Sequence, residues 1–191
     1  MTTIAHRTTE ELTGYLDTLR SAPADTGTLT LVVRRPAVGE REILDVGELH
    51  PNHGLVGDTW AVRGSKRTAD GTSHPDMQLN VMSSRMVAFL AGDDQERQAL
   101  AGDQLYLDLD LSEENLPAWT RLEIGSAGRG AVIEVTDQPH TGCAKFIERF
   151  GEAAMRFVNG REGRPLRLRG LNARVVVPGP VRPGDAVRVI R

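Results

Sequence analysis

The segment His140-Thr-Gly-Cys143 carries the strongest chemical signal in the sequence. It leaves a predicted strand over residues 131–135 and enters a predicted helix over residues 144–158, so the thiol lies at or near a helix N-terminus. The dipole and the free N–H groups of such a terminus favour thiolate over thiol. A thiolate can serve as a nucleophile, a sulfur carrier or a ligand for a soft metal. His140 can pair with it as an imidazolium or contact a bound ligand.

Two other interpretations of Cys143 stay open. A free cysteine is most often a small buried hydrophobic residue without chemistry. A Cys–His hydrolase would use the same pair, but it needs an oxyanion hole and a third, orienting residue that the sequence does not identify. Because Cys143 is the only cysteine, it cannot form an internal disulfide, a Cys-x-x-Cys motif or an unaided iron–sulfur site.

Histidines offer a second kind of site, for zinc. His50 and His53 flank a proline in a predicted loop, and His74, His140 and Cys143 are further donors. His50 and His53 do not stand at the i, i+4 spacing on a helix by which two histidines commonly ligate zinc. The pattern therefore gives a zinc site little support.

Short β-branched runs dominate the chain from residue 28 onward and predict strands, several of them strictly alternating. The predicted strands cover residues 28–33, 42–46, 77–82, 106–111, 131–135, 173–177 and 186–190. Helices are predicted in the first 20 residues, after the cap Thr8, and over residues 83–91 and 144–158. The pattern indicates a mainly β fold of the α+β class, a barrel or strongly bent sheet with about three flanking helices. We expect an N-terminal helical extension over 1–27 and a barrel domain over 28–191.

Two segments between these elements suit binding or tight turns. Residues 61–75 lack apolar periodicity and are rich in Gly, Ser, Thr and charge, which predicts a long loop of the kind that often binds ligands. The segment Gly54-Leu-Val-Gly-Asp58 has glycines on both sides of an apolar pair, and it predicts a tight turn.

The composition limits the classes of function. Hydrophobic residues make up 39% and charged residues 26% of the 191 residues, as in a globular protein. No apolar run approaches the roughly 20 residues that span a bilayer, and the first residues lack the apolar stretch of a secretory signal. We therefore expect a cytoplasmic protein without membrane association. With 4% aromatic residues and no basic–aromatic interleaving, nucleic-acid binding is not supported.

Taken in order and spacing, several segments from about residue 28 to the C-terminus resemble the MOSC family, the molybdenum cofactor sulfurase C-terminal domain. The matching segments are Gly54-Leu-Val-Gly-Asp58, Gln78-Leu-Asn-Val-Met-Ser-Ser84, Glu114-Asn-Leu116, Leu122-Glu-Ile-Gly125, Val135-Thr-Asp-Gln-Pro-His-Thr-Gly-Cys143, Arg169-Gly-Leu-Asn-Ala-Arg-Val175 and Val181-Arg-Pro-Gly-Asp185. Their succession, which ends in a cysteine segment and a Gly-Asp strand turn, carries the resemblance better than any one of them.

The resemblance implies a β-barrel with flanking helices and a site for a pterin molybdenum cofactor. Cys143 matches the family cysteine, which ligates molybdenum or carries sulfur. Asn115, Arg169 and Asn172 match family segments and are expected around the cofactor. From their charge alone, we add the cations of the 61–75 loop as candidate ligands for the cofactor phosphate, and these are Arg63, Lys66 and Arg67.

Two activities follow from the resemblance. The chain is either a reductase of N-oxygenated compounds, which needs a separate electron-transfer protein, or a sulfur carrier in metal–sulfur cluster assembly, which needs a cysteine desulfurase. A homo-oligomer is compatible with both. The family's usual glycine before Glu-Asn-Leu is Glu113 here, and the sequence carries neither a desulfurase segment nor an extra N-terminal barrel. These departures keep open a non-catalytic barrel that binds a small anion, a pterin or a protein partner.

Overall fold

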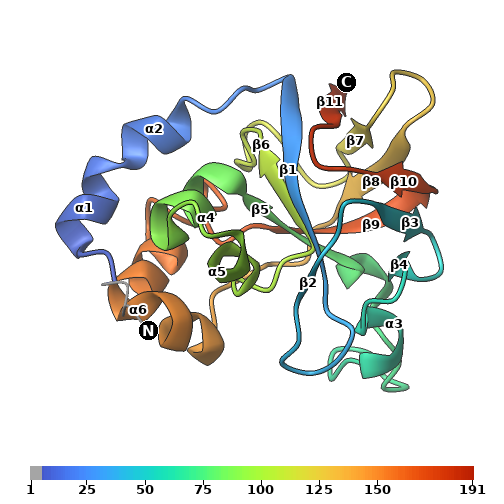
Figure 1. Ribbon diagram of the computed structural model, residues 1–191, viewed down its shortest axis with the longest axis horizontal. Coiled ribbons are helices and arrows are strands. Elements are labelled where there is room, and N and C mark those ends of the chain that lie inside the picture. The colour runs from blue at the N-terminus through green and yellow to red at the C-terminus, as the bar shows by residue number, and fades with distance from the viewer. Residues whose placement is uncertain (1–5) are drawn as a thin grey trace.

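Seven strands close into a β-barrel in the computed structural model, which describes residues 6–191 (Figure 1). In order around the barrel, the strands are β11 (Ala186–Ile190), β7 (Arg121–Ile124), β8 (Ala131–Val135), β9 (Leu171–Val177), β5 (Leu79–Ser83), β6 (Leu105–Asp108) and β1 (Thr26–Arg34). The barrel closes where β1 pairs with β11, with Thr26 opposite Arg188. The short strand β2 (Glu42–Ile43) extends the sheet beyond β1. The sequence prediction of a mainly β barrel is thus confirmed.

One pair of neighbouring barrel strands, β5 and β6, is parallel, with Val81 opposite Leu105. Parallel neighbours cannot be joined by a tight hairpin and need a crossover. Helices α4 (Ser84–Ala91) and α5 (Gln95–Ala99) supply it. This crossover ends in residues 100–104, which return to the barrel beside β5 and form one wall of the site described below.

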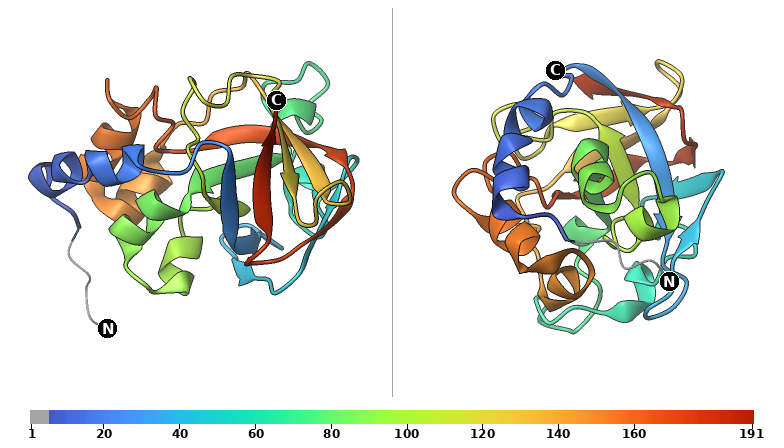
Figure 2. Two further views of the ribbon diagram at one scale, coloured as in Figure 1. Left: turned by 90° about the horizontal axis from the view of Figure 1, so that it is seen from above. Right: turned by 60° about the vertical axis from the view of Figure 1, so that its left-hand side comes forward.

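A bulge in β1 directs the strand's apolar residues to two cores. The register with β6 shifts between Leu29 and Leu31, which changes the alternation of inward and outward side chains. Leu29 and Val32 belong to the core inside the barrel, whereas Leu31 and Val33 belong to a second core between the barrel and the helices. The second core holds the N-terminal helices, the two crossover helices and the helix after Cys143 at one end of the barrel (Figure 2).

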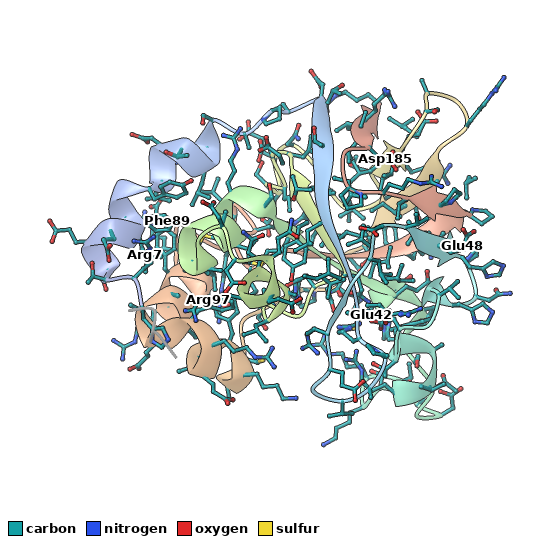
Figure 3. All side chains as sticks on the ribbon, in the orientation of Figure 1. Arg7, Glu42, Glu48, Phe89, Arg97 and Asp185 are labelled. Carbon is teal, nitrogen blue, oxygen red and sulfur yellow. The ribbon has the colours of Figure 1, made fainter. Side chains whose placement is uncertain are left out.

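The N-terminal helices α1 (Thr9–Gly14) and α2 (Leu16–Arg20) pack on the second core. Thr8 and Glu11 form a capping box, with the Glu11 N–H 3.2 Å from the Thr8 hydroxyl and the Thr8 N–H 2.7 Å from the Glu11 carboxylate. Tyr15 stacks on Phe89 of α4 with ring centroids 4.0 Å apart. Arg7 lies over the same ring, 4.6 Å from its centroid, and donates to the Phe89 carbonyl (Figure 3).

Helix α6 (Ala144–Asn159) follows the predicted range but is not one straight helix. Gly151 has φ 88° and ψ 163°, so the helix is interrupted there. A Cβ atom at this position would lie 2.7 Å from the Nδ1 atom of His6, which only glycine avoids. The aligned peptide dipoles above Cys143 are therefore those of residues 144–150 alone.

Several short elements were not predicted. They include β7, the small sheet formed by β10 (Gly179–Val181), β3 (Gly47–His50) and β4 (Gly54–Leu55), helix α3 (Trp60–Arg63) and the 3₁₀ turn η1 (Pro75–Met77). With α3, α5 and the division of the N-terminal helix, the described residues contain six α-helical segments instead of about three. Elements of two to five residues show too little periodicity for a pattern to reveal them. None of the helices in residues 6–191 has the length and apolar character needed to cross a membrane.

Candidate functional site

Cys143 is exposed at the N-cap position of α6 and lines a pocket of about 210 Å³. Its backbone is extended, with φ −131° and ψ 179°, and its carbonyl accepts the N–H of Phe146 at 2.8 Å. Its side chain makes no capping hydrogen bond. The buried-hydrophobe interpretation of Cys143 is therefore wrong, because the thiol reaches solvent.

The pocket around Cys143 is lined by six separate segments of the chain. They are the β1–β2 connection, helix α3 with its N-cap Thr59, Asn80 of β5, residues 101–102, the first two turns of α6, and Arg169 before β9. Six of the lining residues are cations and none is a carboxylate, the cations being Arg35, Arg41, Arg63, Lys145, Arg149 and Arg169. A pocket of this composition favours an anionic ligand.

Two of the six cations are neutralised by buried carboxylates behind the pocket wall. Arg35 donates from Nε to Asp58 at 2.8 Å and from Nη2 to the other carboxylate oxygen at 2.8 Å. Asp58 also accepts the N–H of Arg35 and of Trp60, so its oxygens are well satisfied. Arg169 donates from Nη1 to Asp103 at 2.7 Å.

The other four cations lack such a partner. Within residues 6–191, no carboxylate lies within 4.0 Å of a cationic nitrogen of Arg41, Arg63, Lys145 or Arg149. Burial lowers the pKa of Arg41, and the charges of Arg149 and Arg35 lower it further. Burial also lowers the pKa of Arg63, and Arg35 adds to that effect. The pocket thus contains four cations without a paired carboxylate in the described residues, and the charge of Asp58 offsets that of Arg41 and Arg63 only in part.

Asp103, His140 and Arg169 form a buried cluster beside this pocket. His140 Nε2 lies 2.7 Å from one oxygen of Asp103, and Arg169 Nη1 lies 2.7 Å from the other. Burial alone would raise the pKa of Asp103, but Arg169 and His140 outweigh it, so the pKa lies below its ordinary value. Since an ionised carboxylate can only accept, His140 donates to it from Nε2.

The same cluster favours neutral His140. Burial lowers the pKa of His140, Arg169 lowers it further, and Asp103 only partly opposes this. A neutral ring that donates from Nε2 keeps Nδ1 as an acceptor. The described residues contain no hydrogen bond between His140 and Cys143, so the imidazolium–thiolate pair, one of the two roles that the motif allows for His140, is not formed. His140 instead lines a second pocket of about 290 Å³, and Arg169 lines both pockets.

Asn172 joins the two pockets through a chain of hydrogen bonds. Its Oδ1 accepts from Asn80 at 2.8 Å, and its Nδ2 donates to the carbonyl of Gln138 at 3.2 Å. Asn80 in turn accepts from Arg35 at 3.1 Å. Asn172 is fully buried and does not line the pocket itself. Its role is to hold Asn80, which does line the pocket.

Asn115 lies away from the pocket. Its amide donates to the carbonyls of Ala24 and Asp110, both at 2.8 Å, and its oxygen accepts from Arg191 at 2.8 Å. These bonds join the segment before β1 and the C-terminal Arg191 to the 110–116 connection. Asn115 therefore has a structural role here and lines neither pocket.

The three loop cations are separated by the fold. Arg63 lines the Cys143 pocket and also a neighbouring, open depression that Lys66 lines. Arg67 lines none of these hollows. The histidines proposed for zinc do not gather either. The rings of His50 and His53 are 5.0 Å apart, and the described residues hold no group of three metal-ligating side chains.

Several residues of the site were missed by the sequence interpretation. They are the pocket cations Arg35, Arg41, Lys145 and Arg149, and the buried carboxylates Asp58 and Asp103. One signal was present for Asp58, since it ends the Gly54–Asp58 segment. Gly54 and Gly57 have φ of 64° and 82° there, which confirms the tight turn and explains how Asp58 reaches Arg35.

The fold is similar to those of solved bacterial proteins. YuaD from Bacillus subtilis matches with a TM-score of 0.64 and 19% sequence identity, over 86% of this chain and 95% of that one. YiiM from Escherichia coli matches with a TM-score of 0.52 and 19% identity, over 86% of this chain and 70% of that one. No family profile and no curated protein matches the sequence. The seven-stranded barrel and these structural neighbours fit the MOSC fold that the sequence resembles.

Proposed function

We propose that this chain binds a pterin molybdenum cofactor in the Cys143 pocket, with Cys143 as a thiolate ligand of the metal. The single observation that carries the proposal is the position of this exposed thiol in a pocket with four cations that have no carboxylate partner among residues 6–191. A molybdenum–pterin group is anionic through its phosphate and dithiolene, and a soft metal centre accepts a thiolate readily. The donor set and the charge of the pocket therefore fit the group.

Two buried nitrogen atoms strengthen the fit. The Nε atoms of Arg41 and Arg169 are buried and have no hydrogen-bond partner in the part of the chain that the structure describes, and both residues line the pocket. Unsatisfied buried donors are uncommon in folded proteins and often indicate an absent partner. An anionic ligand supplies acceptors as well as charge.

When bound, the cofactor would supply two-electron chemistry for the reduction of N-oxygenated compounds. The chain's own residues would do the rest. Cys143 would ligate the metal, and the cations of the pocket would hold the anionic groups. His140, kept neutral and oriented by Asp103, would present an acceptor in the adjoining pocket. Electrons would come from a separate protein, because the sequence carries no recognisable flavin or iron–sulfur motif.

The alternative role as a sulfur carrier is favoured by the exposure of the same thiol, which is open to attack by a donor protein. It predicts a persulfide on Cys143 after incubation with a cysteine desulfurase. The reductase proposal predicts retained molybdenum.

The test compares wild type with Cys143→Ser and Cys143→Ala, all made with cofactor biosynthesis intact. Molybdenum content, pterin fluorescence after oxidation and reduction of an N-hydroxylated compound by an artificial donor are measured. We expect both variants to fold but to lose activity and metal, while Arg129→Gln, which changes an exposed arginine elsewhere, behaves as wild type. Equal molybdenum and activity in all the proteins would contradict the role of Cys143. An absence of molybdenum and pterin from wild type would favour the non-catalytic barrel.

A further inference from the structure

We propose that Arg41 and Arg149 form a binding site for a doubly charged oxyanion, such as phosphate or sulfate, beside Gly102 in the Cys143 pocket. This deepens the proposed function, on which it rests only for the identity of the natural ligand, because the pair would take the phosphate end of the cofactor. The binding of a free oxyanion is a property of the chain alone.

The two guanidinium groups approach the same point from different elements. Arg41 comes from the β1–β2 connection and Arg149 from the first part of α6. A Cβ atom at Gly102 would lie 3.1 Å from Nη2 of Arg41 and 3.7 Å from Nη1 of Arg149. Gly102 has φ +89°, a conformation that favours glycine. The backbone of the pocket wall therefore requires a residue without a side chain at this position.

The hydrogen bonds of this arginine pair leave its charge unbalanced. Nη1 of Arg41 donates to the carbonyl of Glu40, and Nη1 of Arg149 donates to the carbonyl of Leu100. Carbonyl oxygens satisfy donors but carry no net charge. Nε of Arg41 is buried and has no acceptor within the described part of the chain. The pair therefore lacks a counter-charge and lacks an acceptor for one donor. An oxyanion supplies both.

The geometry selects a divalent, tetrahedral anion over chloride. Two like charges that share a pocket repel, and the lowered pKa of Arg41, caused by burial and then by Arg149 and Arg35, is consistent with this repulsion. One negative charge offsets only half of the pair. An anion with several oxygens can accept from both guanidinium forks at once, whereas a chloride ion offers no such arrangement.

The test uses protein produced without cofactor synthesis and measures thermal unfolding with phosphate, sulfate or chloride at equal ionic strength. We expect phosphate and sulfate to raise the Tm of wild type above its value in chloride, with saturation. Arg41→Gln and Arg149→Gln should each weaken phosphate binding by about tenfold or more, since charge-assisted hydrogen bonds are lost. Without the anion, both variants should be as stable as wild type or more stable, because each removes one of two repelling charges.

Two controls separate this site from the cofactor assignment. Arg129→Gln makes the same change of charge at an exposed position in the β7–β8 turn and should leave phosphate binding unchanged. Cys143→Ser should also retain it. Phosphate binding in wild type and Cys143→Ser, together with no uptake of molybdenum or pterin, would support the oxyanion site and refute only the cofactor proposal. No stabilisation of wild type over chloride, or equal losses in Arg129→Gln, would overturn the oxyanion site even if the cofactor binds.

Discussion

The substitution Asp103→Asn keeps the shape of a fully buried side chain and removes its charge. Asp103 accepts from Nη1 of Arg169 and Nε2 of His140, each at 2.7 Å. Asparagine has a single acceptor oxygen, so its amide would face one of these two donors. Arg169, of which the side chain is 7% exposed, would remain buried without a counter-ion. The remaining bond from its Nη2 to the Ala101 carbonyl cannot offset that charge.

Removing one partner of a buried ion pair typically costs about 3–5 kcal/mol. In a chain of this size the loss corresponds to a fall in Tm of roughly 6–20 °C. The matched control is Glu152→Gln, which breaks an ion pair with Arg156 in which the two side chains are 65% and 78% exposed. That change should cost about 0.5 kcal/mol or less, because solvent screens the exposed pair.

Urea unfolding of wild type, Asp103→Asn and Glu152→Gln at several pH values measures both effects. The folded pKa of Asp103 lies below its unfolded value, near 3.9. Its charge therefore stabilises the protein above about pH 4, and the contribution is lost as the pH falls from there through the folded pKa. The difference between wild type and Asp103→Asn should shrink in that range. A loss below 1 kcal/mol at neutral pH, or a difference that stays constant on acidification, would refute the reasoning.

Three further perturbations test other parts of the site. Cys143 should react with iodoacetamide in the native protein, since its side chain is exposed, and reaction only after denaturation would contradict its placement. The folded pKa of His140 lies below its unfolded value near 6.5, so the stability from its neutral form is lost as the pH falls below about 6.5. His140→Gln should therefore show a smaller decline in Tm than wild type between about pH 6.5 and pH 5. Curves of Tm against pH that run parallel for the two proteins would contradict this role of His140. Arg63→Ala should reduce cofactor retention severalfold and Arg67→Ala should not, because only Arg63 lines the Cys143 pocket; equal losses would argue against this assignment.

The sequence predicted two of the barrel strands with the bounds that the structure has. The predicted strand 131–135 coincides with β8, and the predicted strand 186–190 coincides with β11. Three other predicted strands are only partly strand in the structure. Residues 42–46 form a strand only at Glu42–Ile43, residues 77–82 begin in a 3₁₀ turn, and residues 106–111 leave the sheet after Asp108. Alternation alone does not distinguish a strand from a connection with apolar anchors: Leu109 and Leu111 continue the alternation and are buried, but they lie beyond the end of β6.

The site was only partly predictable for a different reason. Cys143 and His140 were found because they are close in sequence, and Arg169 because its segment resembles a family motif. Arg41 and Arg149 are far apart in sequence, and each by itself resembles an ordinary surface arginine. They meet because the barrel carries the β1–β2 connection to the same end as α6. The proximity of Arg41 and Arg149 follows from the topology of the fold. The number of cations in a segment of the sequence therefore could not predict it.

The cations of the pocket also link folding to ligand binding. The whole chain has a formal net charge of −3, yet the pocket around Cys143 contains four cations without a carboxylate partner in the described residues. A folded protein that gathers like charges loses stability through their repulsion, and burial of Arg41 increases that loss. A ligand that binds only the folded chain returns stability as RT ln(1 + [L]/Kd), which is about 2.7 kcal/mol at a concentration one hundred times Kd. The protein without an anion is therefore less stable than the protein with an anion in the pocket. The rise in Tm on adding an anion measures the same charge interaction that would retain the cofactor.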